Sequence, residues 1–303
     1  MPRTYYAHPV DVLGKIIPTF TEEQLQADEL FAYEDEEWLL SKIEEYELKL
    51  ENETGHAWRE RRVGSPGHRA TYESWDIDFW RYQNGATLWL DHREAVPLDP
   101  EAGDELLIRT GRDRWKNITA SEGTMWMANY DEARLRIFGH RYRGNWRKAG
   151  LKDNVRITYR YGALGGDENR GGQTTLTSQV GTEETTFEVA DASRLPARGV
   201  VLIGGTEYGQ INSIDPETGA VTVTRGTRRT QAKEHDAGEV VHYCPSEIRA
   251  AVAARVAVEF IQTDHIGDNL PTPDDDLTFS SLIENLKGEW DQALRNRSEA
   301  RML

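Results

Sequence analysis

The stretch from Pro245 to Thr263 constrains this chain more than any other, because its pattern predicts a helix that is buried on several sides. Pro245 suits a first helical position, and Glu247 places negative charge near the positive end of the helix dipole. An apolar stripe recurs every four residues, and alanines cover much of the remaining surface, so another helix can approach closely. The stripe consists of Ile248, Val252, Val256 and Phe260. We therefore expect a central packing helix over residues 245–263.

Three further segments carry helix signals and predict that both ends of the chain join one helical bundle. Residues 34–54 pair an apolar face with a glutamate-rich face, and Gly55 is placed to end the helix. Residues 279–297 repeat the amphipathic pattern, and residues 21–30 open on a threonine that can cap a helix. Residues 1–20 contain three prolines and predict an extended arm or a frayed terminus. The apolar positions of the two longer helices are Leu39, Ile43, Tyr46 and Leu50, then Phe279, Leu282, Leu286, Trp290 and Ala293.

Between these helices the chain carries strand and turn signals, and it therefore predicts an α+β fold. Residues 56–162 hold short alternating segments separated by turn residues, which indicates a β-rich middle. A linker over residues 163–170 leads to residues 171–243, which predict an inserted all-β domain, either a small barrel or a sandwich. Within this block, residues 215–219 predict a hairpin turn. The predicted domains are thus a parent domain of residues 1–162 and 245–303 and an inserted domain of residues 171–243.

Two separated patterns resemble the head-to-tail connector (adaptor) proteins of tailed viruses. In that family a strand of the type V-x-I-x-Y-x-Y-G, here residues 155–162, runs almost directly into a helix of the type P-x-E-I-x-x-A-V, here residues 245–252. The run E-D-E-E-W-L-L from Glu34 and the T-G pair ending at Gly55 are similar to the family's amino-terminal half. The block of residues 171–243 is similar to a small β module of viral structural proteins. The resemblance implies an adaptor with a second domain inserted at the strand–helix junction.

By this resemblance the protein would be a structural virion protein of the neck, made in the host cytoplasm and assembled as a ring through which DNA passes. The ring would be a dodecamer. Its partners would be the portal protein, tail or neck proteins and, through non-specific contacts, DNA, with no membrane and no enzymatic activity. Candidate residues for the portal or subunit interface are Trp290, Leu294, Arg295, Arg297 and Arg301. Candidate DNA-facing residues are Arg141, Arg143, Arg147 and Lys148, in a basic run that also includes Arg134, Arg136, Tyr142 and Trp146. The alternative for these arginines is pairing with the chain's own carboxylates.

The formal net charge of −16 arises from 52 acidic residues against 36 basic ones, of which 28 are arginine and 8 are lysine. Such a surface suits molar salt, where screening removes self-repulsion, and favours a virus of a halophile. An ordinary acidic protein is the alternative. Cys244 is the only cysteine and cannot form an intrachain disulfide. No apolar run approaches the roughly 18 residues that a membrane span needs.

The sequence contains no familiar motif for nucleotide binding, metalloprotease chemistry or an activated nucleophile, so we expect no catalytic, cofactor or metal site. His235 lies in an A-x-x-H-x-x-G turn, where a bond from its ring to the backbone is expected rather than metal ligation. Trp75, Trp80 and Trp89 could stack on sugars, although packing in a core is the favoured expectation. These aromatic residues define the alternative function, a β-rich receptor- or glycan-binding virion protein.

Overall fold

The computed structural model of the chain describes residues 4–16, 33–65, 68, 70–77, 85–92, 94–111, 113–130, 132–138, 153–162, 165, 168–262 and 279–299. By its internal contacts the chain divides into two compact units. Unit 1 comprises Met1–Thr54 with Gly165–Leu303, and unit 2 comprises Gly55–Leu164. This division places the helices and the block of residues 171–243 in one unit, so the predicted parent and insertion boundaries stay a prediction. The predicted helix over residues 21–30 lies outside the described residues.

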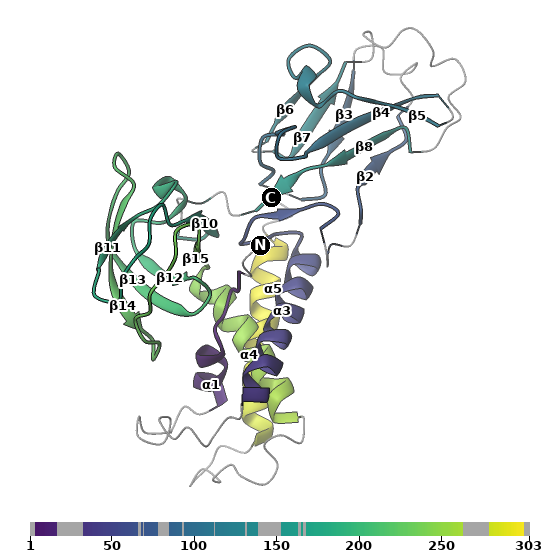
Figure 1. The fold of residues 1–303 in the computed structure, drawn as a ribbon. Helices are drawn as coiled ribbons and strands as arrows, with labels where there is room; N and C mark the ends of the chain where they lie inside the picture. Colours follow the sequence, from purple (N-terminus) through teal and green to yellow (C-terminus); the bar gives the residue numbers. More distant parts are fainter. Residues whose placement is uncertain are drawn as a thin grey trace. The chain divides into compact units, whose positions relative to one another are not determined.

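Four α-helices are described in unit 1: α1 (Pro9–Ile16), α3 (Tyr33–Thr54), α4 (Ser246–Gln262) and α5 (Phe279–Glu299) (Figure 1). α4 packs against the other three, and both its valine stripe and its alanine surface are buried. The helices predicted over residues 34–54, 245–263 and 279–297 are therefore confirmed to within one or two residues at each end. Since unit 1 and unit 2 also contain antiparallel sheets, the predicted α+β class is confirmed.

Aromatic rings and aliphatic side chains fill the contacts between these helices. The rings of Trp38 on α3 and Phe260 on α4 have their centroids 5.5 Å apart. Tyr46 meets Trp290 of α5 edge to face at 5.9 Å. The predicted stripe of α3 is buried at Leu39, Ile43 and Leu50. Gly55 follows α3 with a φ of 67°, the left-handed conformation that a helix end favours and that glycine adopts without steric cost.

The first described segment forms neither an extended arm nor a frayed end. It folds into α1, whose Val12 and Ile16 lie four residues apart and are buried. Tyr6 donates from its N–H to the carboxylate of Glu47 and from its hydroxyl to that of Glu51. Both glutamates belong to the glutamate-rich face of α3, and they are buried because this N-terminal segment covers them.

A six-stranded antiparallel sheet forms the β part of unit 1, which we call the β module. Its strand order is β10-β15-β12-β13-β14-β11, and the sheet curls into a half-barrel (Figure 1). The predicted turn of residues 215–219 is confirmed, since Gly219 N–H donates to Asp215 C=O at 2.9 Å between β13 and β14. The strands are β10 (Gly172–Thr175), β11 (Thr186–Glu188), β12 (Gly199–Ile203), β13 (Glu207–Asp215), β14 (Ala220–Thr227) and β15 (Val240–Tyr243). Their inward side chains, such as Val201, Val221 and Val241, form the core of the module.

Unit 2 contains three small antiparallel sheets around one apolar core. Their strand orders are β2-β8-β4-β5, β3-β7-β6 and β1-β9. The core is centred on Trp126, whose indole N–H donates to Ile118 C=O at 2.8 Å. The strands are β1 (Arg61–Arg62), β2 (Glu73–Trp75), β3 (Ala86–Trp89), β4 (Glu105–Gly111), β5 (Arg114–Asn117), β6 (Trp126–Asn129), β7 (Arg134–Ile137), β8 (Val155–Thr158) and β9 (Arg160–Tyr161).

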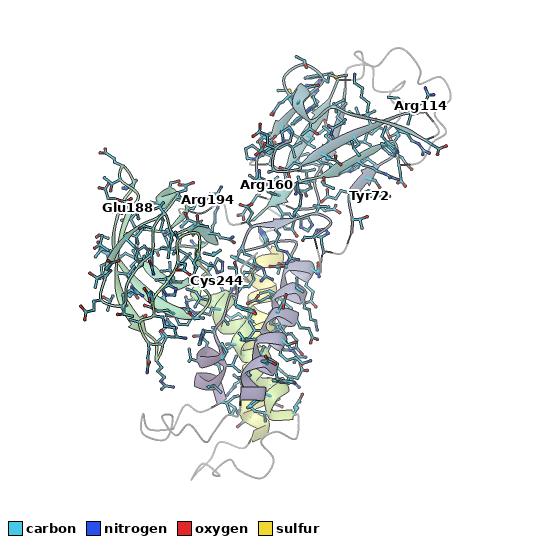
Figure 2. All side chains as sticks on the ribbon, viewed as in Figure 1. Tyr72, Arg114, Arg160, Glu188, Arg194 and Cys244 are labelled. Carbon is cyan, nitrogen blue, oxygen red and sulfur yellow. The ribbon has the colours of Figure 1, made fainter. Side chains whose placement is uncertain are left out.

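A buried carboxylate ties the short β1-β9 pair to the rest of unit 2. Asp104 is 1% exposed and accepts hydrogen bonds from Arg62 at 2.7 Å and from Arg160 at 3.2 Å. Arg160 is labelled in Figure 2. Gly162 then ends the predicted strand with a φ of 79°. A Cβ at this position would lie 2.6 Å from the carbonyl oxygens of Ala57 and Arg59, so only glycine fits there.

Candidate functional site

The residues predicted for a portal or subunit interface fall into different environments on α5. Trp290 is 5% exposed and contributes to the helical core. Leu294 is half-buried and Arg295 is exposed, so these two are available at the surface of α5. The side chain of Arg297 and the whole of Arg301 lie outside the described residues.

The predicted DNA-facing set, Arg141, Arg143, Arg147 and Lys148, also lies outside the described residues. Two arginines of the same basic run are described on β7. Arg134 pairs across the sheet with Trp89 of β3 and Arg136 pairs with Met127 of β6. Trp89 and Met127 are exposed by 60% and 47%. The sheet β3-β7-β6 therefore presents one outer face, the Trp89 face, with a large aromatic ring and two guanidinium groups.

Trp89 corrects one sequence-based expectation. Core packing was favoured for all three tryptophans, and it applies to Trp75, which is partly buried against the core of unit 2. Trp89 instead points to solvent, because it occupies the face of β3 opposite to buried Ala86 and Leu88. The Arg134 guanidinium lies 5.7 Å from the centre of its ring, a cation–π contact, and Trp80 lies outside the described residues.

Unit 1 holds a second candidate, a cleft of about 680 Å³ between α1, the turn after β14 and the start of α4. A smaller cleft of about 250 Å³ shares Arg228, Ser246 and Arg249 with it and reaches the buried Cys244 (Figure 2). Four cations line the larger cleft, Lys15, Arg228, Arg229 and Arg249, against two carboxylates, Asp11 and Glu247. On a chain with a net charge of −16, this is a local surplus of two positive charges, since four minus two is two.

The wall of this cleft is fixed by a buried junction between α1 and the β module. The Tyr208 hydroxyl donates to the Asp11 carboxylate and accepts from His8 N–H at 3.1 Å. Burial, only partly offset by Asp11, lowers the pKa of His8 to about 4, so this ring is neutral in the fold. The His242 ring also bonds the carbonyl of Tyr5 at 3.0 Å. These contacts hold α1 against the β module.

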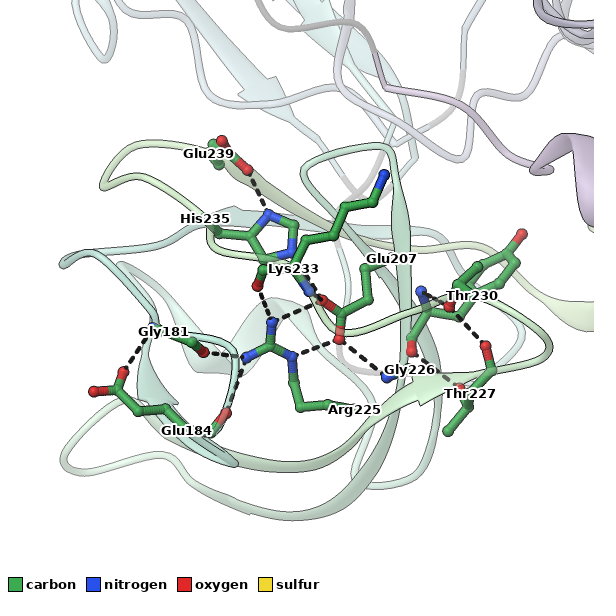
Figure 3. A network of polar contacts seen from close by, with 11 residues as sticks. Gly181, Glu184, Glu207, Arg225, Gly226, Thr227, Thr230, Lys233, His235 and Glu239 are labelled. Atoms are coloured by element: carbon green, nitrogen blue, oxygen red, sulfur yellow. Dashed lines mark hydrogen bonds and ion pairs between the residues drawn. The ribbon is translucent and has the colours of Figure 1, made fainter. Parts of the chain in front are cut away.

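The β module contains a buried charge network (Figure 3). The Arg225 guanidinium donates through two nitrogens to the two oxygens of Glu207, which is fully buried. The His235 ring bonds Glu207 at 3.0 Å and Glu239 at 2.7 Å. Its ring therefore bonds carboxylates and not the backbone, which corrects the expectation from the turn motif. Burial alone would raise the pKa of Glu207, but the bonds from Arg225 and His235 outweigh it and lower that pKa to about 2.

Unit 2 contains a buried carboxylate whose hydrogen-bond donors, among the residues that the structure describes, are neutral. Glu73 on β2 accepts from the Tyr159 hydroxyl at 2.6 Å and from Asp91 N–H at 3.1 Å. Burial raises the pKa of Glu73 to about 7, because these two bonds only partly compensate for desolvation. The neighbouring His92 ring stacks on Tyr161 with centroids 3.9 Å apart. No group of three potential metal ligands occurs anywhere in the part of the chain that the structure describes.

No known protein family, curated protein or solved structure matches the chain. Within the described ranges, no helix has the length and apolar character needed to cross a membrane. The function is therefore argued from the sequence pattern, the fold and the surfaces above.

Proposed function

We propose that this chain is a structural virion protein, a head-to-tail adaptor that forms a ring between the portal and the tail or neck proteins of a tailed virus. The observation that supports it best is the position of α4. α4 follows a long β-rich part of the chain and packs against α1 and α3, which precede that part, and against α5, which follows it. This is the arrangement that the adaptor-like patterns at residues 34–55, 155–162 and 245–252 lead us to expect.

The strand pairing in the β module supports the domain organisation that we propose, a helical bundle with an inserted β domain. β10 at the start of the module pairs with β15 at its end, and Gly172 lies opposite Tyr243 in that ladder. The entry and exit of the module are therefore adjacent, as an insertion into an existing domain requires. In unit 1 the module also contacts α1, but α1 packs against α4 as well, so removing residues 171–243 should leave the helices folded while the bond from Tyr208 to Asp11 is lost.

The surface of α5 is suited to contacts between subunits. Glu284, Lys287, Asp291 and Arg295 are exposed along this helix, and buried Leu286, Trp290 and Ala293 lie on its inner face. A charged outer helix face supports a polar interface with neighbouring copies or with the portal. The acidic composition supports assembly at high salt, and we expect the melting temperature to rise with KCl concentration.

The proposal is tested by size-exclusion chromatography with light scattering in high-salt buffer, with and without the cognate portal protein. We expect the chain to co-elute with the portal as an assembly of many copies. A 34.5 kDa species that ignores the portal at every salt concentration and protein concentration would contradict the adaptor function.

The Trp89 face favours a second candidate, a receptor- or glycan-binding virion protein. An exposed tryptophan beside arginine is a common platform for stacking on sugar rings or other planar groups. Binding to a panel of host surface glycans distinguishes the two candidates. If Trp89→Ala abolishes glycan binding while the wild-type chain does not associate with the portal, the second candidate replaces the first.

A further inference from the structure

The larger cleft of unit 1 contains a largely buried arginine that no described carboxylate holds at hydrogen-bond distance. Arg249 on α4 is 4% exposed, yet its guanidinium makes no hydrogen bond to any described residue. Its closest carboxylate oxygen, on Asp11, is 4.0 Å from Nε, and its other contact is the Tyr208 ring, 5.4 Å away. A buried cation is stable only when charge or hydrogen-bond acceptors compensate for its lost hydration. Arg249 lines both clefts, so an additional acceptor would approach it through them.

Two exposed arginines stand at the mouth of the same cleft. Arg229 forms no ion pair or hydrogen bond with any residue in the described part of the chain, and Arg228 is 3.7 Å from an oxygen of Asp11. The remaining cation, Lys15, already pairs with Glu289 of α5. Arg228 and Arg249 share the one Asp11 carboxylate at 3.7 and 4.0 Å, so these two guanidinium groups and that of Arg229 can still donate to further carboxylates, which they recognise with paired N–H donors.

Small residues make up part of the lining of the cleft, which we call its floor. It includes Gly14 on α1 and Ala250 and Ala253 on α4. A Cβ added at Gly14 would meet no atom within 4 Å, so open space lies directly above this glycine. Small side chains on the floor and cations at one end leave room for an extended peptide with acidic side chains.

We propose that this cleft binds an acidic segment of a second copy of this chain. Charge complementarity identifies the occupant, since each copy carries 52 acidic residues and a net charge of −16, whereas the cleft has a positive surplus. Asp11 and Glu247 repel a compact dianion such as phosphate more strongly than they repel single carboxylates spaced along a peptide. The proposal rests on the adaptor function above, because a ring supplies each subunit with a neighbouring copy.

The test uses the full chain and sedimentation velocity over a range of protein concentrations. In the variant Arg228→Asn with Arg229→Asn, asparagine tolerates the left-handed backbone of both residues, whose φ angles are 54° and 66°. We expect self-association to weaken by roughly tenfold or more, because two charge-assisted contacts are lost. Gly14→Met, which fills the floor, should weaken it as well. Arg114→Gln removes one exposed charge from unit 2 and should leave association unchanged.

A peptide probe separates this inference from the adaptor proposal. A labelled octapeptide with the sequence of residues 270–277, LPTPDDDL, should bind the cleft and compete with self-association, and LPTPNNNL should bind roughly tenfold or more weakly. If the wild-type chain associates but neither the arginine variant nor the peptide alters association, the cleft inference is wrong and the adaptor proposal stands. If inorganic phosphate displaces the peptide at lower concentration than free carboxylates do, the cleft is an oxyanion site and the inference is also wrong. If the wild-type chain never associates, both the cleft inference and the adaptor proposal are wrong.

Discussion

The β module and unit 2 each bury one glutamate at the start of a strand, and the pKa values of these two carboxylates shift in opposite directions. Glu207 begins β13 and is held by Arg225 and His235, so its pKa falls to about 2. Glu73 begins β2, and burial raises its pKa to about 7 because its donors in the described part of unit 2 are one phenol and one amide. Both side chains are at most 5% exposed. The donors explain the opposite shifts, because Glu207 accepts from Arg225, His235 and two backbone N–H groups, whereas Glu73 accepts from one phenol and one backbone N–H.

This difference indicates two kinds of stabilisation. In the β module, the buried charge is part of the folded structure, because Arg225 also donates to the carbonyls of Gly181 at 3.0 Å and Lys233 at 2.5 Å and so joins the β10–β11 loop to the β14–β15 loop (Figure 3). In unit 2 the charged form of Glu73 is a cost that the apolar core must offset. The two units should consequently respond differently to the same substitutions and to pH.

The largest effect is expected from Arg225→Met. It leaves Glu207 buried without its cation and removes the bonds to two loop carbonyls, which should destabilise the β module by about 3–5 kcal/mol. Hydrogen exchange of peptides from β12 to β14 measures this, and protection should fall steeply there. Arg114→Gln, at an exposed position, is the matched control and should change stability by less than about 0.5 kcal/mol. A change of similar size in the two variants would show that the Glu207–Arg225 pair contributes little.

Neutralising the two glutamates should give effects of opposite sign. At about pH 8, Glu73→Gln removes a desolvated charge and should stabilise unit 2 by about 1–3 kcal/mol, from the rise in pKa to about 7. Glu207→Gln at the same pH weakens the bonds to Arg225 and should destabilise the β module by about 2–3 kcal/mol. Urea unfolding of each variant measures both values. Destabilisation of unit 2 by Glu73→Gln would mean that Glu73 is ionised with a partner.

A smaller effect is expected in the pH dependence of the wild-type chain. Glu73 has a raised pKa, so its cost to unit 2 appears as pH rises from about 4.5 to about 7 and disappears on acidification. His8 has a lowered pKa, so unit 1 loses stability as pH falls from 6.5 towards about 4. His235, whose pKa is raised by its bonds to Glu207 and Glu239 against the effect of burial, contributes stability that is lost as pH rises above 6.5.

Two spectroscopic signals separate the units in this experiment. Seven of the nine tryptophans belong to unit 2, since only Trp38 and Trp290 lie in unit 1, whereas all described α-helices lie in unit 1. On acidification from about pH 6.5 to about pH 5, the unfolding midpoint seen by fluorescence should move to higher urea concentration, and the midpoint seen by circular dichroism to lower urea concentration. Each shift should correspond to a change of about 1 kcal/mol in the free energy of unfolding. Identical shifts of both signals would contradict the contrast between the two units.

The smallest effect is expected from Trp89→Ala. Because this side chain is 60% exposed, its loss should change the stability of unit 2 by less than about 0.5 kcal/mol. The buried Trp126 is the matched comparison, and Trp126→Ala should cost about 3–5 kcal/mol. A large loss of stability in Trp89→Ala would place its ring in a packed interface.

The sequence predicted the helices well because α3, α4 and α5 each carry a long apolar period, which is a local signal. It missed α1, whose short length and proline suggested an extended segment, and with it the burial of Glu47 under Tyr6.

The charge network and the cleft depended on contacts that no local period records. Glu207 lies on β13, Arg225 on β14 and His235 after β14, so no local period in the sequence records that their side chains meet. The cleft brings together α1, the turn after β14 and α4, which are far apart in the chain. Trp89 was misassigned because alternation in a strand shows two faces without showing which of them is buried.

Sedimentation velocity of the wild-type chain in about 2 M KCl, alone and with its cognate portal, tests the adaptor proposal most directly. The proposal predicts a discrete species whose mass is a large whole-number multiple of 34.5 kDa and which binds the portal. A chain that sediments as a 34.5 kDa monomer in both samples, over the full range of salt and protein concentration, would contradict it.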